Sequence, residues 1–146
     1  MKGTQKITRV QLKINQKDES SLVGIVTAEP DYKLSLSLNK IFKISLKTSS
    51  PVKIFDEKGF ELEFSRFSDN TNAPEITYNL ISNRSGNNYL LKKLKNIDYI
   101  FQVQDPYNLN DTNIFTASLR AIDSVTAVFN IDNNIIKDKN LQYLIQ

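Results

Sequence analysis

The chain has 146 residues, 40% of them hydrophobic and 24% charged, with a formal net charge of +3. This length and balance are typical of one globular domain, so we expect a single domain over residues 1–146. Cysteine and histidine are both absent, which excludes disulfides, thiolate and imidazole metal ligands, cysteine nucleophiles and histidine-mediated proton transfer. The composition implies no cofactor and leans away from an enzyme.

The distribution of charge and hydropathy gives two further expectations. Lysine and arginine are interleaved with aspartate and glutamate through most of the chain, whereas nucleic-acid-binding domains usually concentrate basic residues on one face. No stretch has the apolar length of a signal peptide or of a membrane-spanning helix. We therefore expect a soluble, cytoplasmic protein that does not contact membranes.

The N-terminal part of the chain predicts strands. Residues 7–14 alternate apolar and charged or polar side chains in the manner of a half-buried strand. After a polar break, residues 22–26 form either a second short strand or the lead-in to a helix.

A helix is predicted over residues 30–43, because its apolar residues have helical spacing and a proline in the first turn loses no hydrogen bond. The apolar stripe consists of Leu34, Leu38, Ile41 and Phe42. A break at residues 48–51 ends this region, and residues 56–59 are predicted to form a loop or turn.

Three later runs alternate in the manner of an antiparallel meander, and turn-forming residues connect them. They cover residues 60–67, 76–81 and 97–103. A second helix then begins at Asp111 or Thr112, with one face made by Ile114, Phe115, Leu119 and Ile122. Strand alternation resumes over residues 125–131, and a short apolar terminus is expected to dock on the body through Leu141, Leu144 and Ile145.

Strands outnumber helices, and several neighbouring strands are close in sequence. The predicted fold class is therefore α+β: a mostly antiparallel sheet of five or six strands with two main helices packed on one face. We find no internal repeat, linker or second domain.

Four cations near one tyrosine form the first candidate binding site: Arg84, Lys92, Lys93 and Lys95 surround Tyr89 in the sequence. A basic groove with aromatic side chains is the arrangement that single-stranded nucleic-acid sites use. The alternative is a solvated approach to a strand, in which lysines keep an edge from pairing. One aromatic among four cations meets few criteria for a binding site, so the structural interpretation is favoured.

Three aspartates near the end of a predicted strand are the second candidate site. Asp98, Asp105 and Asp111 could bind a hard cation such as Mg²⁺ through their carboxylate oxygens. The segment DPYNLND lacks the glycine and terminal glutamate of an EF-hand loop, however, and its residue pairs are ordinary turn chemistry. Residues 83–88 contain one glycine and no GK[ST], so they do not form a phosphate-binding loop.

Two Asp-Tyr steps occur in the chain. Asp31 stands at the predicted start of a helix, where a carboxylate interacts favourably with the helix dipole. Asp98 precedes Tyr99, which is expected in the core on a face shared with Ile97 and Phe101. Asp98 is then expected to face the other side of the strand. If that side is covered by other parts of the chain, its carboxylate needs a polar or charged partner.

The sequence of residues 91–99, LKKLKNIDY, resembles the signature of the bacterial family called IPExxxVDY. Asp98 and Tyr99 match the signature outright, with leucine for its first isoleucine and isoleucine for its valine. Lys92 and Lys93 stand in place of the central Pro-Glu, which reverses the local charge.

Two other stretches, residues 31–40 and 119–132, are similar to the same family in order and spacing. The resemblance implies a small single-domain protein of unassigned function, and it carries no catalytic residue across. It marks positions of unassigned role: Asp31, Asn39, Asp98 and Tyr99.

The leading functional expectation is a non-enzymatic binding or structural module that acts through protein contacts, including self-association along a sheet edge. The first alternative is a nucleic-acid-associated domain that uses the basic patch. The least favoured alternative is a Mg²⁺-dependent enzyme that uses Asp98 or Asp105.

Overall fold

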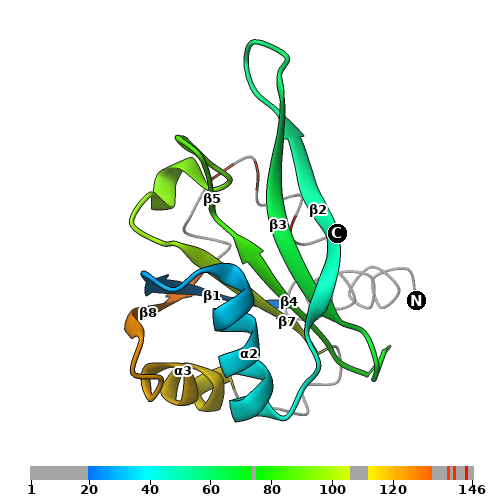
Figure 1. The fold of residues 1–146 in the computed structure, drawn as a ribbon, viewed down its shortest axis with the longest axis vertical. Coiled ribbons are helices and arrows are strands. Elements are labelled where there is room, and N and C mark those ends of the chain that lie inside the picture. Colours follow the sequence, from blue (N-terminus) through cyan, green and yellow to red (C-terminus); the bar gives the residue numbers. More distant parts are fainter. Residues whose placement is uncertain are drawn as a thin grey trace, which may run out of the picture.

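The computed structural model describes residues 20–73, 75–105, 112–132, 138, 140 and 144. At its centre is a six-stranded antiparallel sheet with the strand order β2-β3-β4-β7-β1-β8, and two α-helices cover one face of it (Figure 1). A separate two-stranded sheet consists of β5 and β6. The predicted α+β class, with an antiparallel sheet and helices on one face, is confirmed. The predicted strand at residues 7–14 lies outside the described residues.

Strands make up most of the described elements, and helices lie between some of them. The strands are β1 Ser20–Thr27, β2 Lys47–Phe55, β3 Glu61–Asp69, β4 Thr77–Ser82, β5 Arg84–Ser85, β6 Asn88–Tyr89, β7 Tyr99–Gln104 and β8 Val125–Ile131. The helices are α2 Asp31–Phe42, the 3₁₀ helix η1 Lys92–Leu94 and α3 Thr112–Arg120. The predicted segment at residues 22–26 is thus a strand.

Helix α2 confirms the prediction for residues 30–43. Pro30 precedes its first turn, and Lys43 ends it in the left-handed conformation with φ 55°. Leu34 and Leu38 are fully buried against the sheet, as their spacing predicts. Ile41 is 39% exposed, because the strip of α2 that faces the sheet is narrower than the predicted apolar stripe.

Strand β2 contradicts the predicted break at residues 48–51. The break was predicted because Ser50-Pro51 is typical of a turn, and yet Pro51 lies within the strand. Two features accommodate it: β2 is an edge strand, and its pairing with β3 shifts register between Ser49 and Val52. Proline is tolerated at such positions because no ladder hydrogen bond needs its missing N–H.

The C-terminal part follows the predicted order of helix and strand. In α3, Phe115 and Leu119 are buried, but Ile114 is exposed and so does not belong to the inner face. Leu144 is buried and its carbonyl accepts a hydrogen bond from the side chain of Gln102, which confirms its docking on the body. Leu141 and Ile145, predicted to dock with it, lie outside the described residues.

The sheet separates two apolar clusters. The cluster under the helices includes Val23, Ile25, Leu34, Leu38, Tyr99, Phe101, Phe115, Leu119 and Val128. The cluster on the opposite face includes Leu22, Val52, Ile54, Phe64, Ile81, Leu90, Leu91, Ile97, Ile100 and Leu144.

The two clusters confirm one predicted position and correct another. Tyr99 and Phe101 share the helix-covered face, as predicted. Ile97 belongs to the opposite face, contrary to prediction, because β7 begins only at Tyr99 and the alternation does not extend back to residue 97.

Candidate functional site

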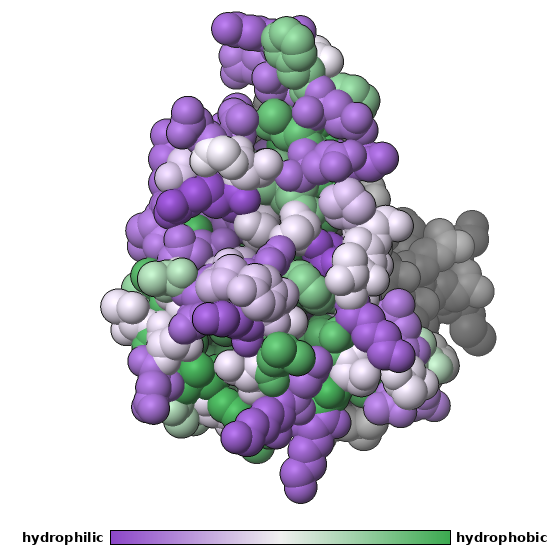
Figure 2. Space-filling view, viewed as in Figure 1, coloured by the Kyte–Doolittle hydropathy of each residue, from purple (hydrophilic) through white to green (hydrophobic). Residues whose placement is uncertain are grey.

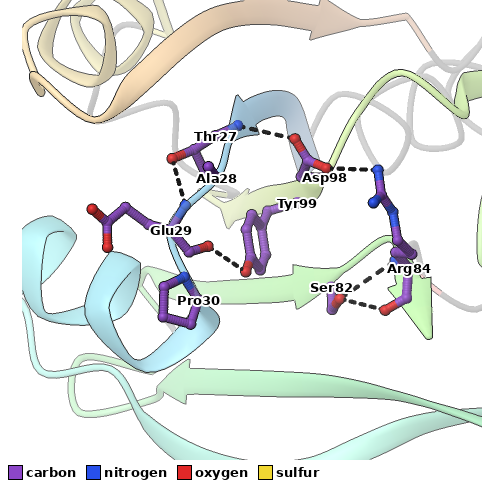
Figure 3. Close-up of a pocket in the computed structure, with 8 residues that line it drawn as sticks. All are labelled: Thr27, Ala28, Glu29, Pro30, Ser82, Arg84, Asp98 and Tyr99. Atoms are coloured by element: carbon purple, nitrogen blue, oxygen red, sulfur yellow. Dashed lines mark hydrogen bonds and ion pairs between the residues drawn. The ribbon is translucent and has the colours of Figure 1, made fainter. Parts of the chain in front are cut away.

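A polar pocket of about 360 Å³ lies where β1 leads into α2, beside the end of β4 and the start of β7 (Figure 3). Three segments that are distant in sequence meet there. The residues that line it are Thr27, Ala28, Glu29, Pro30, Ser82, Arg84, Asp98 and Tyr99.

Asp98 lies at the centre of the pocket's polar contacts. Its Oδ2 accepts a hydrogen bond from the backbone N–H of Thr27 at 3.0 Å, and its Oδ1 accepts one from Nη2 of Arg84 at 3.0 Å. The Asp98 side chain is 21% exposed and that of Arg84 is 50% exposed. The Asp98 carboxylate is therefore half-buried. The sequence predicted that it needs a partner, and its partners are the backbone of β1 and the side chain of Arg84.

Tyr99 closes the pocket on the side of the core. Its hydroxyl donates a hydrogen bond to the carbonyl of Glu29 at 2.7 Å. Burial raises the pKa of Tyr99 to about 12, and the negative charges of Asp31, Asp98 and Glu29 act in the same direction against the lowering by Arg84. At neutral pH the phenol is protonated, so it serves as a hydrogen-bond donor and not as a base.

The hydroxyl groups of Thr27 and Ser82 also have partners within the chain. The Thr27 hydroxyl donates to the Ser124 carbonyl at 2.7 Å and accepts from the Glu29 N–H at 3.1 Å. The Ser82 hydroxyl donates to the Arg84 carbonyl at 2.7 Å. The Thr27 hydroxyl thus joins the end of β1 to the segment before β8, and the Ser82 hydroxyl fixes the chain after β4, which are structural roles.

The structure brings three of the four positions of unassigned role together. Asp98 and Tyr99 line the pocket, and Asp31 is the first residue of α2, close enough to influence Tyr99. Asn39 lies at the other end of α2, where its Oδ1 accepts the N–H of Leu46 at 2.7 Å. Its Nδ2 donates to the Leu46 carbonyl at 3.3 Å, so Asn39 joins the end of α2 to the segment before β2.

The predicted basic patch is assembled in part. Arg84 Cζ lies 5.6 Å and Lys95 Nζ 5.9 Å from the centre of the Tyr89 ring, distances at which cations interact favourably with an aromatic face. Lys92 and Lys93 lie on η1 and are exposed. Arg84 is hydrogen-bonded to Asp98 and lies against the Tyr89 ring. The basic patch therefore consists of exposed lysines and one arginine that also lines the pocket.

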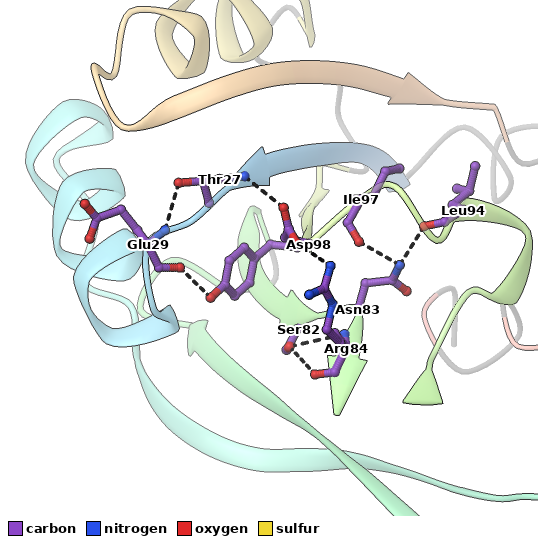
Figure 4. A network of polar contacts seen from close by, with 9 residues as sticks. Thr27, Glu29, Ser82, Asn83, Arg84, Leu94, Ile97 and Asp98 are labelled. Carbon is purple, nitrogen blue, oxygen red and sulfur yellow. Dashed lines mark hydrogen bonds and ion pairs between the residues drawn. The ribbon is translucent and has the colours of Figure 1, made fainter. Parts of the chain in front are cut away.

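Asn83 is a structurally important residue that the sequence did not single out. Its side chain is fully buried, and its Nδ2 donates to the carbonyls of Leu94 at 2.8 Å and Ile97 at 3.0 Å (Figure 4). Its Oδ1 accepts the Leu91 N–H at 2.7 Å, and its own N–H donates to the Asp98 carbonyl at 2.9 Å. Asn83 thereby fixes the path of residues 91–98.

The candidate metal ligands are not gathered in one place. Asp98 is paired with Arg84, Asp105 is a buried residue after β7, and Asp111 lies outside the described residues. Within the described ranges, no group of three or more acidic side chains could hold a metal ion.

The β2–β3 hairpin presents a feature that the sequence pattern did not predict. It projects beyond the rest of the sheet (Figure 1) and ends in Phe55 and Phe60, which are 71% and 65% exposed. The space-filling view shows hydrophobic atoms at this tip among hydrophilic ones (Figure 2). The predicted strand at residues 60–67 included Phe60, but β3 begins only at Glu61. The signal in the sequence was a turn flanked by two phenylalanines.

The turn that carries these rings is well defined. Asp56 Oδ1 accepts the N–H groups of Lys58 at 2.9 Å and Phe60 at 2.8 Å. The Asp56 N–H donates to the Phe60 carbonyl at 2.9 Å, and its carbonyl accepts the Gly59 N–H at 3.0 Å. Gly59 has φ 85°, which glycine adopts without steric cost. The predicted turn at residues 56–59 is confirmed.

Comparisons with known proteins leave the family open. No model of a known protein family matches the chain, and no curated protein matches it significantly. The resemblance to the IPExxxVDY family stays a prediction. Among the described helices, none is long and apolar enough to cross a membrane.

Proposed function

We propose that the protein is a non-enzymatic interaction module that binds a protein partner through the tip of the β2–β3 hairpin. The observation that supports this proposal is the pair of phenylalanines, Phe55 and Phe60, held in solvent by a hydrogen-bonded turn. Aromatic side chains that are exposed on a rigid element contribute a large apolar area to an interface at low entropic cost. The fold itself gains little burial from either ring.

The charge around the tip favours a protein over a phosphate-bearing partner. Residues 53–63 contain four carboxylates and two lysines, a net charge of −2, although the whole chain carries +3. Lys53 is already paired with Glu61 at 3.9 Å and with Glu63 at 3.7 Å. A negative tip repels nucleic acid and anionic lipid, whereas an apolar protein pocket accepts the two rings. Membership of the IPExxxVDY family and a cytoplasmic location are part of the same proposal.

The test is affinity capture from the source cell with the tip altered. The variant Phe55→Ser/Phe60→Ser changes two exposed rings, and Leu36→Ser on α2 is a matched control because Leu36 is 64% exposed. We expect wild type and the control to retain one partner, identified by mass spectrometry and unaffected by nuclease, and the tip variant to lose it. A partner retained equally by the tip variant contradicts the proposal.

Nucleic acid at the basic patch is a second candidate, supported by the approach of Arg84 and Lys95 to Tyr89. It predicts binding of a single-stranded oligonucleotide that weakens steeply with salt. Fluorescence anisotropy with wild type and with Lys92→Glu/Lys93→Glu tests it, since the double charge reversal should abolish binding. Unchanged binding by that variant rules the patch out.

A further inference from the structure

The two edges of the six-stranded sheet differ in a way that matters for strand addition. At one edge, β2 contains Pro51, Lys47 and Lys53, and its register shifts between Ser49 and Val52. These are the features by which natural proteins block pairing at an edge. At the other edge, β8 has the sequence VTAVFNI, without proline, glycine or charge. Its pairing with β1 also shifts register, at residue 126, so the two edges differ in composition and not in regularity. Only β8 has the composition of an edge open to pairing.

The backbone of β8 also has the required orientation at Val128. On β1, the Ile25 carbonyl accepts the Asp98 N–H at 2.9 Å, so the backbone groups of Ile25 face β7. Val128 lies opposite Ile25 in the β1–β8 ladder. Because antiparallel pairs alternate between bonded and non-bonded, the N–H and carbonyl of Val128 face away from β1. This carbonyl accepts a hydrogen bond from Nη2 of Arg120 on α3 at 3.4 Å, so one of its two lone pairs is used within the chain and the other is left for a partner's N–H.

We propose that β8 pairs antiparallel with β8 of a second copy of the chain, around a twofold axis between the two Val128 residues. Val128 is the midpoint of Val125–Ile131, so this register overlaps the whole strand and centres it on the regular part of β8, residues 127–131. It joins the two six-stranded sheets into one continuous sheet. Within the described part of the chain, no other strand pairs with this side of β8.

This register makes the strand complementary to itself. Phe129, which is 45% exposed, lies across from Ala127 of the partner, so a large ring meets a small side chain. Thr126 lies across from the partner's Asn130, and both are exposed polar residues that can hydrogen-bond across strands. No charged pair is brought face to face. The proposal is separate from the hairpin tip, and either can fail without the other.

Sedimentation velocity of the full chain over a range of concentrations tests this dimer. Thr126→Lys/Asn130→Lys places like charges opposite each other twice, and we expect it to weaken the dimer by about tenfold or more. Thr126→Lys/Asn130→Glu places opposite charges at the same two pairs and should restore it. Thr48→Lys/Ser50→Lys on β2 is the matched control and should leave the dimer unchanged. Circular dichroism verifies that each variant is folded.

Each outcome decides the proposal. A wild-type chain that stays monomeric overturns it, as does a dimer that the control disrupts and the β8 lysines do not. If both double variants at residues 126 and 130 are equally monomeric, the register is wrong. Cysteine cross-linking gives an independent readout because the native chain has no thiol. Oxidising a mixture of Thr126→Cys and Asn130→Cys should yield mixed dimers, whereas either variant alone should yield few.

Discussion

Gly24 and Ile97 fit together with no space for one more carbon: a β-carbon on Gly24 would lie 2.4 Å from Cδ1 of Ile97. Ile97 belongs to the segment that leads into β7, and Gly24 lies in the middle of β1. The next residue, Asp98, donates its N–H to the Ile25 carbonyl. The bare backbone of Gly24 thus lets the segment that carries Asp98 lie directly on β1.

Gly24→Ala is expected to destabilise the protein by about 1–3 kcal/mol, since overpacking in a core forces side chains and backbone apart. The same change on an Ile97→Val background should cost less, because valine lacks the Cδ1 atom that makes the closest approach. Urea unfolding of the wild type, both single variants and the double variant measures this coupling. Equal costs of Gly24→Ala on the two backgrounds would contradict the contact.

Asn83→Ala should be among the most damaging polar substitutions in the chain. It removes the side-chain partners of the Leu91 N–H and of the Leu94 and Ile97 carbonyls. Each buried polar group left without a partner costs about 1–3 kcal/mol, so we expect a loss on the order of 3 kcal/mol or more. Hydrogen exchange of the Leu91 amide should accelerate. Asn88→Ala on exposed β6 is the control, and a similar loss there would refute the assignment.

Much of the fold is predictable from local patterns, because spacing determines which residues share a face. Helix α2 and the strands β3, β4, β7 and β8 lie close to their predicted positions. Strand β2 was missed because a Ser-Pro pair is read as a break unless the strand is known to lie at an edge. That position depends on the order of strands in the sheet, which a single segment does not encode.

The candidate site was less predictable, because its contacts join distant segments. Asp98 and Tyr99 drew attention through a short sequence motif, but their partners Thr27 and Glu29 lie about 70 residues earlier. Asn83 belongs to a segment with the composition of a turn, and nothing in its local sequence distinguishes it. Its hydrogen bonds to residues 91–98 exist only in the folded chain. The exposure of Phe55 and Phe60 was not predictable from alternation, which assigns every apolar side chain to a buried face.

The raised pKa of Tyr99 predicts a loss of stability in alkali. The phenol is held neutral in the folded state up to about pH 12, whereas the unfolded chain ionises near 10. The stabilisation is therefore fully present below pH 10 and declines as the pH rises toward 12. Tyr99→Phe removes the hydrogen bond to Glu29, so its unfolding free energy at pH 7 should be about 1 kcal/mol below that of the wild type. Between pH 10 and pH 12 the unfolding free energy of this variant should fall less steeply than that of the wild type.

Tyr32→Phe is the matched control, because Tyr32 is largely exposed on α2. We expect it to follow the wild type at every pH in urea unfolding from pH 7 to pH 11. If Tyr99→Phe follows the wild type as well, the Tyr99 phenol is not the group that titrates on unfolding.

Asp69 makes the corresponding prediction in acid. Burial alone would raise the pKa of Asp69, but hydrogen bonds from the Thr71 side chain and from the N–H groups of Ser45 and Thr71, with the charge of Lys47, lower it below the ordinary 3.8. Its carboxylate accepts the Ser45 N–H at 2.8 Å and the Thr71 N–H at 2.9 Å. A lowered pKa stabilises the fold above the unfolded value, and this contribution is lost as the pH falls through the folded value.

Asp69→Asn should therefore reduce the unfolding free energy at pH 7. The difference from wild type should shrink at pH 3, because the carboxylate of the unfolded chain takes up a proton below its ordinary pKa of 3.8. Glu57→Gln at the exposed hairpin turn provides the control and should match the wild type at both pH values. Because Asp69 ends β3 and holds the segment before β2, the loss at pH 7 should also appear as faster hydrogen exchange at the Ser45 amide. If Asp69→Asn lowers the unfolding free energy equally at pH 3 and pH 7, the charge of Asp69 does not contribute to stability, and the loss comes from the changed side-chain contacts alone.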